Sequence, residues 1–176
     1  MIGTKIKMAT ALSIDELEEI GIGKKFQDAL CVMLESSYLF KDFSRQEIEQ
    51  LVQYMHGYKA PKGSTLFKEG EHDSHLIIIT RGKAQILKDD DFGEMKEIAV
   101  VRKGATLGEM SVIDDFSHSA TVIICEDAEI ALITKANLKN ITEKYPTLGV
   151  KLLWQIARQL SARVRQASGQ LVDHIE

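Results

Sequence analysis

The chain has 176 residues, of which 44% are hydrophobic and 27% are charged, and its formal net charge is −4. This length and apolar content suffice for one domain with a sizeable core. The acidic balance excludes an overall field that would attract nucleic acid or an anionic membrane surface. The longest apolar runs, such as 76–79, are far shorter than the roughly 20 residues that cross a bilayer. No secretory leader pattern stands at the start, so we expect a cytoplasmic protein.

The first third of the chain carries helix signals. The S-x-x-E motifs that begin at Ser13 and Ser44 match the capping box, and they predict helices over residues 14–20 and 45–55. Apolar residues within 26–34 recur at helical spacing, which predicts a short helix between these two.

From residue 58 to residue 134 the pattern changes to short β-branched runs separated by Gly-bearing or acidic turns. The expected strands are 76–80, 84–87, 98–101, 121–125 and 130–134. The expected turns are Glu69-Gly70-Glu71, Arg81-Gly82, Asp91-Phe92-Gly93, Lys103-Gly104 and Glu126-Asp127. This spacing favours an antiparallel β jelly-roll, a double-stranded β-helix, over alternating βαβ units.

Helical periodicity returns over about 135–173, first in a short helix at 136–143 and then in a long helix that begins near Pro146. Apolar residues of the long helix are spaced four and three apart, as in a coiled-coil seam. The seam consists of Leu153, Ala157, Leu160, Val164, Ala167 and Leu171. Two interpretations stay open: the seam pairs with a second copy as a homodimer, which we favour, or it packs on the roll of its own chain.

The predicted fold is therefore α+β. Residues 1–37 would form an N-terminal helical extension, and residues 38–176 would form one domain with its roll at about 58–134.

Gly108 and Glu109 mark the segment with the clearest chemistry. The pair predicts a tight turn into a very short helix, whose free backbone amides would bind an anionic oxygen. Glu109 would then accept hydrogen bonds from hydroxyl groups of the same ligand, so a sugar phosphate satisfies both groups. Ser119 and Thr121 lie at alternate positions downstream, and one or both hydroxyls would donate to the phosphate if a strand begins there.

The segment 107–122 resembles the phosphate-binding cassette of the cyclic nucleotide-binding domain family, which includes the catabolite activator protein, kinase regulatory subunits and gated channels. The residues that carry the resemblance are Leu107, Gly108, Glu109, Met110 and Ser111, then Ser119, Ala120, Thr121 and Val122. Residues 67–70 and 76–82 resemble the family's turn and the strand after it. The resemblance covers about residues 38–170.

The resemblance implies a regulatory module of jelly-roll fold with cyclic AMP or cyclic GMP as its ligand, no cofactor and no catalytic activity. Family members that regulate transcription carry a helix-turn-helix after the long helix. Only Val172 to Glu176 follow the seam here, so we expect no direct DNA binding and an output through a partner protein or the dimer.

One position departs from the family pattern. Ser117 and His118 stand where the family has proline and the phosphate-binding arginine. Imidazole lacks the permanent charge and planar fork of guanidinium. Losing a charge-assisted hydrogen bond costs about 1.5 to 3 kcal/mol, or roughly ten- to hundredfold in affinity. If His118 binds the phosphate as imidazolium, affinity should rise as the pH falls toward and below about 6.5. Alternatively, His118 caps a surface loop and the pocket is empty or serves another ligand.

The resemblance also places Arg163 and Val164 of the long helix near the base of a bound nucleotide. Arg163 would stack on the base or hydrogen-bond to it. The alternative is a solvated arginine on the flank of the helix.

Other signals point to structure rather than chemistry. His72 and His75 form an H-x-x-H that lacks the spacing of a cupin metal site, and Phe92 occupies a ligand position in what would be a calcium loop. Cys31 and Cys125 are expected as buried free thiols. No catalytic motif is present, so we predict a sensor and neither an enzyme nor a metal protein. The alternatives are a protein-interaction scaffold without nucleotide and, less favoured, a cupin-like metal-binding protein.

Overall fold

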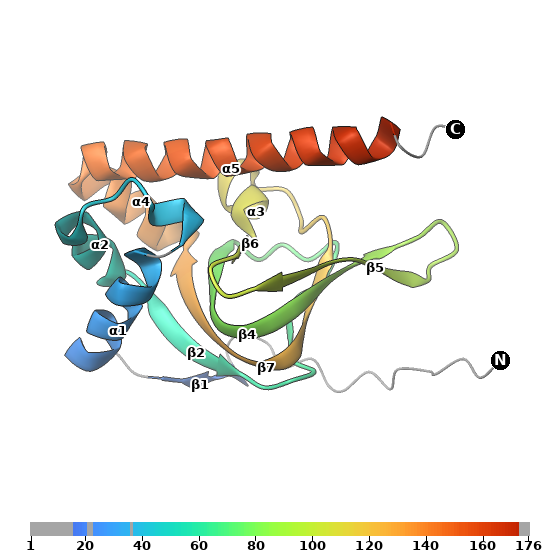
Figure 1. Cartoon of the computed structure of the whole chain (residues 1–176), viewed down its shortest axis with the longest axis horizontal. Helices are drawn as coiled ribbons and strands as arrows, with labels where there is room; N and C mark the ends of the chain where they lie inside the picture. Colours follow the sequence, from blue (N-terminus) through green and yellow to red (C-terminus); the bar gives the residue numbers. More distant parts are fainter. Residues whose placement is uncertain (1–15, 21–22, 36, 173–176) are drawn as a thin grey trace.

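The computed structural model of the chain describes residues 16–20, 23–35 and 37–172 (Figure 1). Its helices are α1 (Lys24–Glu35), the short 3-10 helix η2 (Tyr38–Phe40), α2 (Arg45–Val52), α3 (Glu109–Asp114), α4 (Lys135–Lys144) and α5 (Pro146–Val172). Its strands are β1 (Glu18–Glu19), β2 (His56–Ala60), β3 (Thr65–Phe67), β4 (His75–Asp89), β5 (Met95–Arg102), β6 (Thr106–Leu107) and β7 (Thr121–Thr134).

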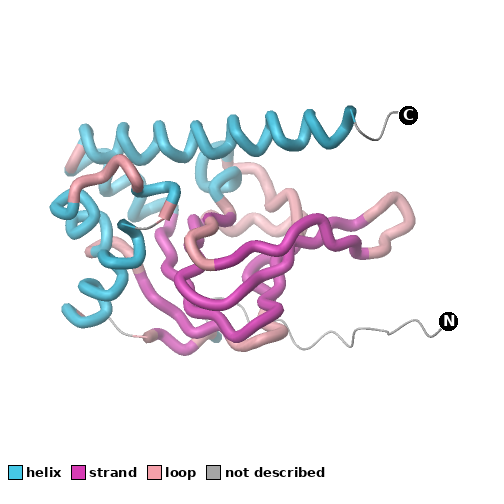
Figure 2. Tube along the Cα trace, viewed as in Figure 1, coloured by secondary structure: helices cyan, strands magenta, loops and turns pink. Residues whose placement is uncertain are grey.

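The strands form one antiparallel sheet that curls into a roll. Its order is β1-β2-β7-β4-β5, with β3 paired to β7 and β6 paired to β4. The long strands β4 and β7 pair from His75 opposite Thr134 to Leu87 opposite Thr121. Helices α1, α2 and α4 gather at one end of the roll, while α5 passes over both parts of the molecule (Figures 1 and 2). The predicted α+β jelly-roll is confirmed.

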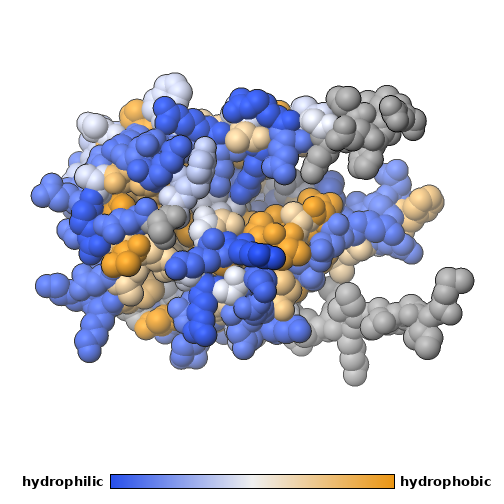
Figure 3. Space-filling model, viewed as in Figure 1, coloured by the Kyte–Doolittle hydropathy of each residue, from blue (hydrophilic) through white to orange (hydrophobic). Residues whose placement is uncertain are grey.

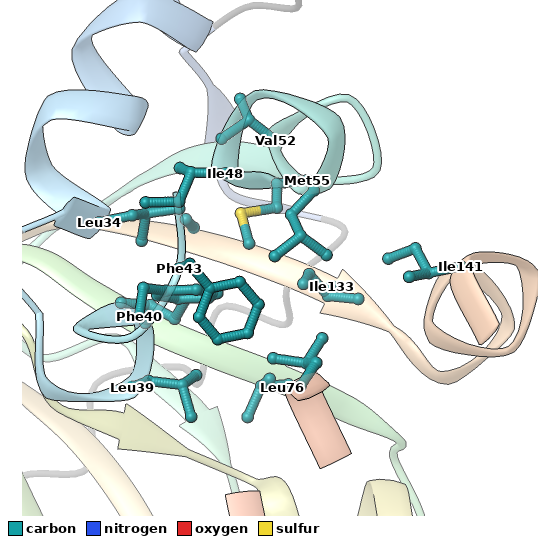
Figure 4. Packing of buried hydrophobic residues seen from close by; sticks show 14 of the residues in the cluster. Leu34, Leu39, Phe40, Phe43, Ile48, Val52, Met55, Leu76, Ile133 and Ile141 are labelled. Carbon is teal, nitrogen blue, oxygen red and sulfur yellow. The ribbon is translucent and has the colours of Figure 1, made fainter. Parts of the chain in front are cut away.

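Strand β4 separates two apolar clusters. Successive strand residues point to opposite faces, so Leu76 and Ile78 pack among the helices, whereas Ile77 and Ile79 fill the roll. In the helical cluster, Phe40 and Phe43 meet edge to face with ring centroids 5.2 Å apart (Figure 4). Because β4 contributes side chains to both clusters, it joins the helical end of the molecule to the roll that carries the candidate site.

Two predicted turns are wrong, because residues 81–82 and 126–127 lie inside the long strands β4 and β7. Gly82 adopts φ +81°, and a Cβ at this position would lie 2.4 Å from the carbonyl oxygen of Asp127. The register shifts around this point, so both strands bend together instead of ending. The turns at 69–71, 91–93 and 103–104 are confirmed.

The capping box at Ser44 is confirmed, since its backbone amide donates to Glu47 Oε2 over 2.7 Å and its hydroxyl accepts from the Glu47 amide. Helix α2 ends at Val52, earlier than predicted. Ser13 lies outside the described residues. Within 16–20 the predicted helix is wrong, because Glu18 and Glu19 pair with β2 instead. The pairing buries the neighbouring Leu17 in the roll, which outweighs a local capping signal.

Helix α5 buries a stripe that differs from the predicted seam. Its inner face carries Leu148, Leu152 and Ile156, which belong to the helical core cluster, and the partly buried Leu160 packs against that cluster. Of the predicted seam, Leu153, Ala157, Val164 and Ala167 are exposed, and the side chain of Leu171 lies outside the described residues. The intramolecular interpretation is therefore wrong for most of the described seam residues; Leu160 is the one of them that packs on the helical core cluster.

Several smaller expectations can be compared with the structure. Among the described residues, no helix combines the length and the apolar composition needed to cross a membrane. Cys31 is a buried free thiol as predicted, but Cys125 is only partly buried. Helix α1 buries Leu30 and Leu34 in the same cluster as α5, and the boundary between residues 1–37 and 38–176 stays a prediction.

Candidate functional site

The site is organised by a sharp bend at Gly108, between β6 and α3. Gly108 adopts φ +75°, a left-handed conformation that favours glycine. A Cβ at this position would lie 2.2 Å from the carbonyl oxygen of His75. The bend therefore requires glycine for two independent reasons, and it starts the short helix α3 at Glu109, as predicted.

The chain after α3 is held by the turn that connects β3 and β4. The His118 amide donates to the Glu71 carbonyl and the Gly70 amide donates to the His118 carbonyl, both over 2.9 Å. The Thr121 hydroxyl accepts from the Glu69 amide over 3.0 Å. Residues 107–122, called the cassette below, are thus fixed at both ends by the roll.

His118 is a buried side chain and not a surface cap. Its ring stacks on Phe67, with centroids 3.9 Å apart and planes 11° apart. Burial lowers the pKa of His118, although Asp73 opposes this shift. Its Nε2 atom is buried and has no hydrogen-bonding partner within the described part of the chain. A neutral imidazole is therefore favoured, and any protonation linked to a ligand shifts to lower pH than the sequence suggested.

Glu109 is only 2% exposed and is joined to α5 by Arg163. Arg163 donates through Nη1 to Glu109 Oε1 and through Nη2 to the Thr106 carbonyl, the latter over 2.7 Å. Burial raises the pKa of Glu109, while the guanidinium favours the carboxylate. The second oxygen, Oε2, is buried without a hydrogen-bonding partner among the described residues. The carboxylate is thus oriented by α5 with one oxygen left over.

These residues surround a cavity of about 430 Å³. This volume lies in the range of about 300 to 1,000 Å³ that is typical of small-molecule pockets. The walls combine cassette residues with an apolar part from β3, β4, β5 and β7 and a polar edge from α5. The cavity could hold a flat apolar group on one side and hydroxyl or anionic groups on the other.

The structure brings most of the predicted site residues to this cavity. Those that line it are Leu107, Gly108, Glu109, Met110, Ser111, His118, Ser119 and Arg163. Ala120 and Thr121 do not line it, and the Thr121 hydroxyl accepts a backbone hydrogen bond instead. Arg163 is not a free solvated arginine, because it donates to Glu109 and to the Thr106 carbonyl; its contact with a base stays a prediction.

Sequence reasoning missed other parts of the wall. These are Phe67, Ile86, Ile98, Ala99, Val101, Val122, Gln166 and Ala167. Apolar side chains gather below α5 near the middle of this face (Figure 3), and Ile98 of β5 is 59% exposed. Phe67 and Val122 stand in segments that resemble the family, which was the only sequence signal for any of these residues. The alternation of side chains along a strand does not show which face lines a cavity.

The residues set aside as metal ligands form no site. Within the described ranges, no three His, Cys, Asp or Glu side chains lie close enough together to hold a metal ion. Asp90 Oδ1 accepts from the amides of Phe92 and Glu94, both over 2.9 Å, so it closes the hairpin turn as expected. The cupin-like alternative has no ligand set in this part of the chain.

Comparisons with known proteins point to one family. Residues 59–145 match the family model described as the cyclic nucleotide-binding domain. The chain is 24% identical over 127 residues to the cyclic AMP receptor protein of Thermus thermophilus, covering 72% of this chain and 59% of that protein. It is 26% identical over 108 residues to a cAMP-dependent protein kinase regulatory subunit of Aspergillus fumigatus, covering 61% of this chain and 25% of that protein.

A solved structure extends the likeness to nearly the whole chain. The crystal structure of a cyclic nucleotide-binding domain from Methylobacillus flagellatus has a TM-score of 0.81 and 29% identity, and the match covers 92% of this chain and 91% of that one. The matched family region contains the entire cassette and most of the roll. Through residues 59–145, this chain therefore belongs to the cyclic nucleotide-binding domain family.

Proposed function

We propose that the chain is a regulatory sensor that binds a cyclic nucleotide, of the cyclic AMP or cyclic GMP type, in the cavity beneath α5. The observation that carries the proposal is a pair of buried atoms, Glu109 Oε2 and His118 Nε2, without a hydrogen-bonding partner among the described residues. Both residues line the same cavity. Buried polar groups almost always have partners, so an unused acceptor and an unused ring nitrogen in one cavity fit a polar ligand.

The cavity chemistry matches the parts of a nucleotide. Glu109 offers a carboxylate oxygen to the ribose hydroxyls, and the first-turn amides of α3 lack partners within that helix and can meet the phosphate. The apolar wall suits the base. Membership of the family supports this assignment of groups.

His118 makes the expected affinity lower than that of a site with arginine at this position. A buried neutral imidazole supplies no charge to the phosphate, and the missing charge-assisted bond costs roughly ten- to hundredfold in affinity. Ligand binding would act through α5, because Arg163, Gln166 and Ala167 of that helix form part of the wall. A ligand that contacts α5 better in one position shifts the helix toward it.

Thermal unfolding tests the proposal. With cyclic AMP or cyclic GMP at 100 times its dissociation constant, the added stability should be about 2.7 kcal/mol. For a domain of this size we expect the midpoint to rise by about 5 to 10 °C. Calorimetric titration measures the dissociation constant, which is needed to set the ligand concentration in the unfolding experiment.

Glu109→Gln should reduce the affinity about tenfold, because a charged acceptor becomes a neutral one. Glu97→Gln is the matched control, since Glu97 is an exposed carboxylate on β5 that does not line the cavity. If neither nucleotide raises the midpoint at any soluble concentration, the sensor is excluded and the scaffold without nucleotide is favoured.

We also propose that α5 pairs with α5 of a second copy. The apolar residues Leu153 and Val164 are 36% and 65% exposed and keep the coiled-coil spacing. Val164→Asp should weaken self-association at least tenfold, because pairing would bury two like charges. Sedimentation velocity measures the change. Val32→Asp on α1, where Val32 is 61% exposed, is the control; equal effects of the two substitutions would contradict an α5 interface.

A further inference from the structure

The charges around the cavity cancel before any ligand binds. Apart from His118, the acidic and basic side chains among its lining residues are Glu109 and Arg163, and they form a salt bridge with each other. Their pairing leaves the cavity close to neutral. A phosphate brings a negative charge into this half-open cavity, and a charge that is partly withdrawn from water is stabilised by charge-assisted hydrogen bonds. The phosphate therefore needs a cation that the paired state does not supply.

His118 is poorly placed to be that cation. Its ring lies flat on Phe67, the residue as a whole is 5% exposed, and burial lowers the pKa of His118. Arg163 has the opposite properties, because its side chain is 41% exposed and its guanidinium is permanently charged. A guanidinium has five N–H donors, and the structure uses Nη1 and Nη2. The guanidinium of Arg163 can therefore move away from Glu109 and still contact solvent, so its own charge would not be buried without a partner.

We propose that Arg163 of α5 is the phosphate ligand of this site, in place of the arginine missing at position 118. This inference rests on the proposed nucleotide binding. Ribose hydroxyls would replace Arg163 on Glu109, and the released guanidinium would bind the phosphate oxygens. Each charged group keeps hydrogen-bonding partners in this exchange, since the Glu109 carboxylate changes the N–H donor of the guanidinium for O–H donors of the ribose, and the guanidinium changes a carboxylate oxygen for phosphate oxygens.

The exchange has a direct consequence for α5. Arg163 lies beyond the buried stripe that ends near Leu160, in the part of the helix that forms the cavity wall. A phosphate ligand would therefore attach this part of α5 to the ligand itself, whereas a nucleoside without phosphate would only compete with Arg163 for Glu109. The attachment of α5 to the ligand would therefore differ between a charged phosphate ligand and an uncharged nucleoside.

The test compares cyclic AMP with adenosine, which lacks the phosphate, by calorimetric titration of the full chain. The wild-type chain should bind cyclic AMP at least tenfold more tightly than adenosine, and Arg163→Gln should reduce this ratio about tenfold, because only the α3 amides would still contact the phosphate. Arg165→Gln is the matched control, because Arg165 donates to Ser161 over 2.7 Å and does not line the cavity. It should keep the wild-type ratio.

Two further variants separate recognition from folding. Arg163→Lys keeps the charge that pairs with Glu109 and should keep part of the preference for cyclic AMP. Arg163→Gln combined with His118→Arg should restore the ratio to tenfold or more, because the new arginine supplies a phosphate donor; no restoration would mean that Arg163→Gln damages the cavity itself.

The inference is overturned if Arg163→Gln keeps the wild-type ratio, or if it tightens both ligands equally, which would make Arg163 a competitor only. Both outcomes leave nucleotide binding intact. A wild-type chain that binds both ligands equally also overturns the inference, and one that binds neither overturns it together with the proposed function.

Discussion

Replacing Gly108 with alanine is expected to destabilise the fold by about 3 kcal/mol and to abolish ligand binding. The left-handed backbone costs an alanine about 1 to 2 kcal/mol. Displacing the His75 carbonyl, which would lie 2.2 Å from the new Cβ, adds a packing cost of about 1 to 3 kcal/mol. The lower entropy of the unfolded alanine variant offsets about 0.4 to 1 kcal/mol. Urea unfolding at pH 7.5 measures the net change.

Gly93 provides a matched control for this substitution. It has the same φ of +75°, but no atom lies within 4 Å of the position where its Cβ would be. Gly93→Ala should therefore show only the backbone cost, at most about 1.6 kcal/mol after the entropy offset. If both substitutions destabilise the fold equally, the close approach of the bend to His75 is not important, and the account of the cassette is wrong.

His118→Arg is expected to tighten cyclic nucleotide binding ten- to hundredfold, since it adds a charge-assisted hydrogen bond to the phosphate. The stacked position on Phe67 suits a guanidinium, because its flat cation packs well on an aromatic face. Calorimetric titration with cyclic AMP at pH 7.5 measures the gain. His72→Arg adds the same charge to an exposed position that does not line the cavity, and it should change the affinity little.

The pH dependence separates the two side chains at position 118. Burial lowers the pKa of the free His118, so the ring is neutral at pH 7.5. A bound phosphate that contacts the ring would raise this pKa, and affinity would then increase as the pH falls from the raised pKa of the complex toward the lowered pKa of the free protein. The arginine variant should show no such increase. Unchanged weak binding by His118→Arg would mean that other parts of the cassette do not fit a phosphate.

The features that the sequence predicted correctly depend on few neighbouring residues. The capping box at Ser44 joins groups three residues apart, and the turns at 91–93 and 103–104 contain glycines with positive φ. The bend at Gly108 and the start of the short α3 are also local, because they depend on one glycine and on the amides of the first helical turn. Caps, turns and bends that depend on residues within about one turn of the chain can be predicted without knowing the fold.

The errors arise where distant segments compete with local signals. The capping motif at Ser13 predicts a helix, yet Glu18 and Glu19 pair with β2, because that strand offers backbone groups and a place for Leu17 in the roll. The segments 81–82 and 126–127 look like turns individually. They lie opposite each other, and mutual pairing carries both strands through the bend.

From its sequence alone, the chain specifies an antiparallel roll between helical ends, a glycine bend with a carboxylate beside it, and a histidine where the family has arginine. Only the tertiary structure decides that Glu109 meets Arg163, 54 residues away, that His118 lies on Phe67, and which face of α5 is buried. Periodicity and local propensity act over a few residues. Burial, charge pairing and the walls of a cavity depend on which distant elements the folded chain brings together.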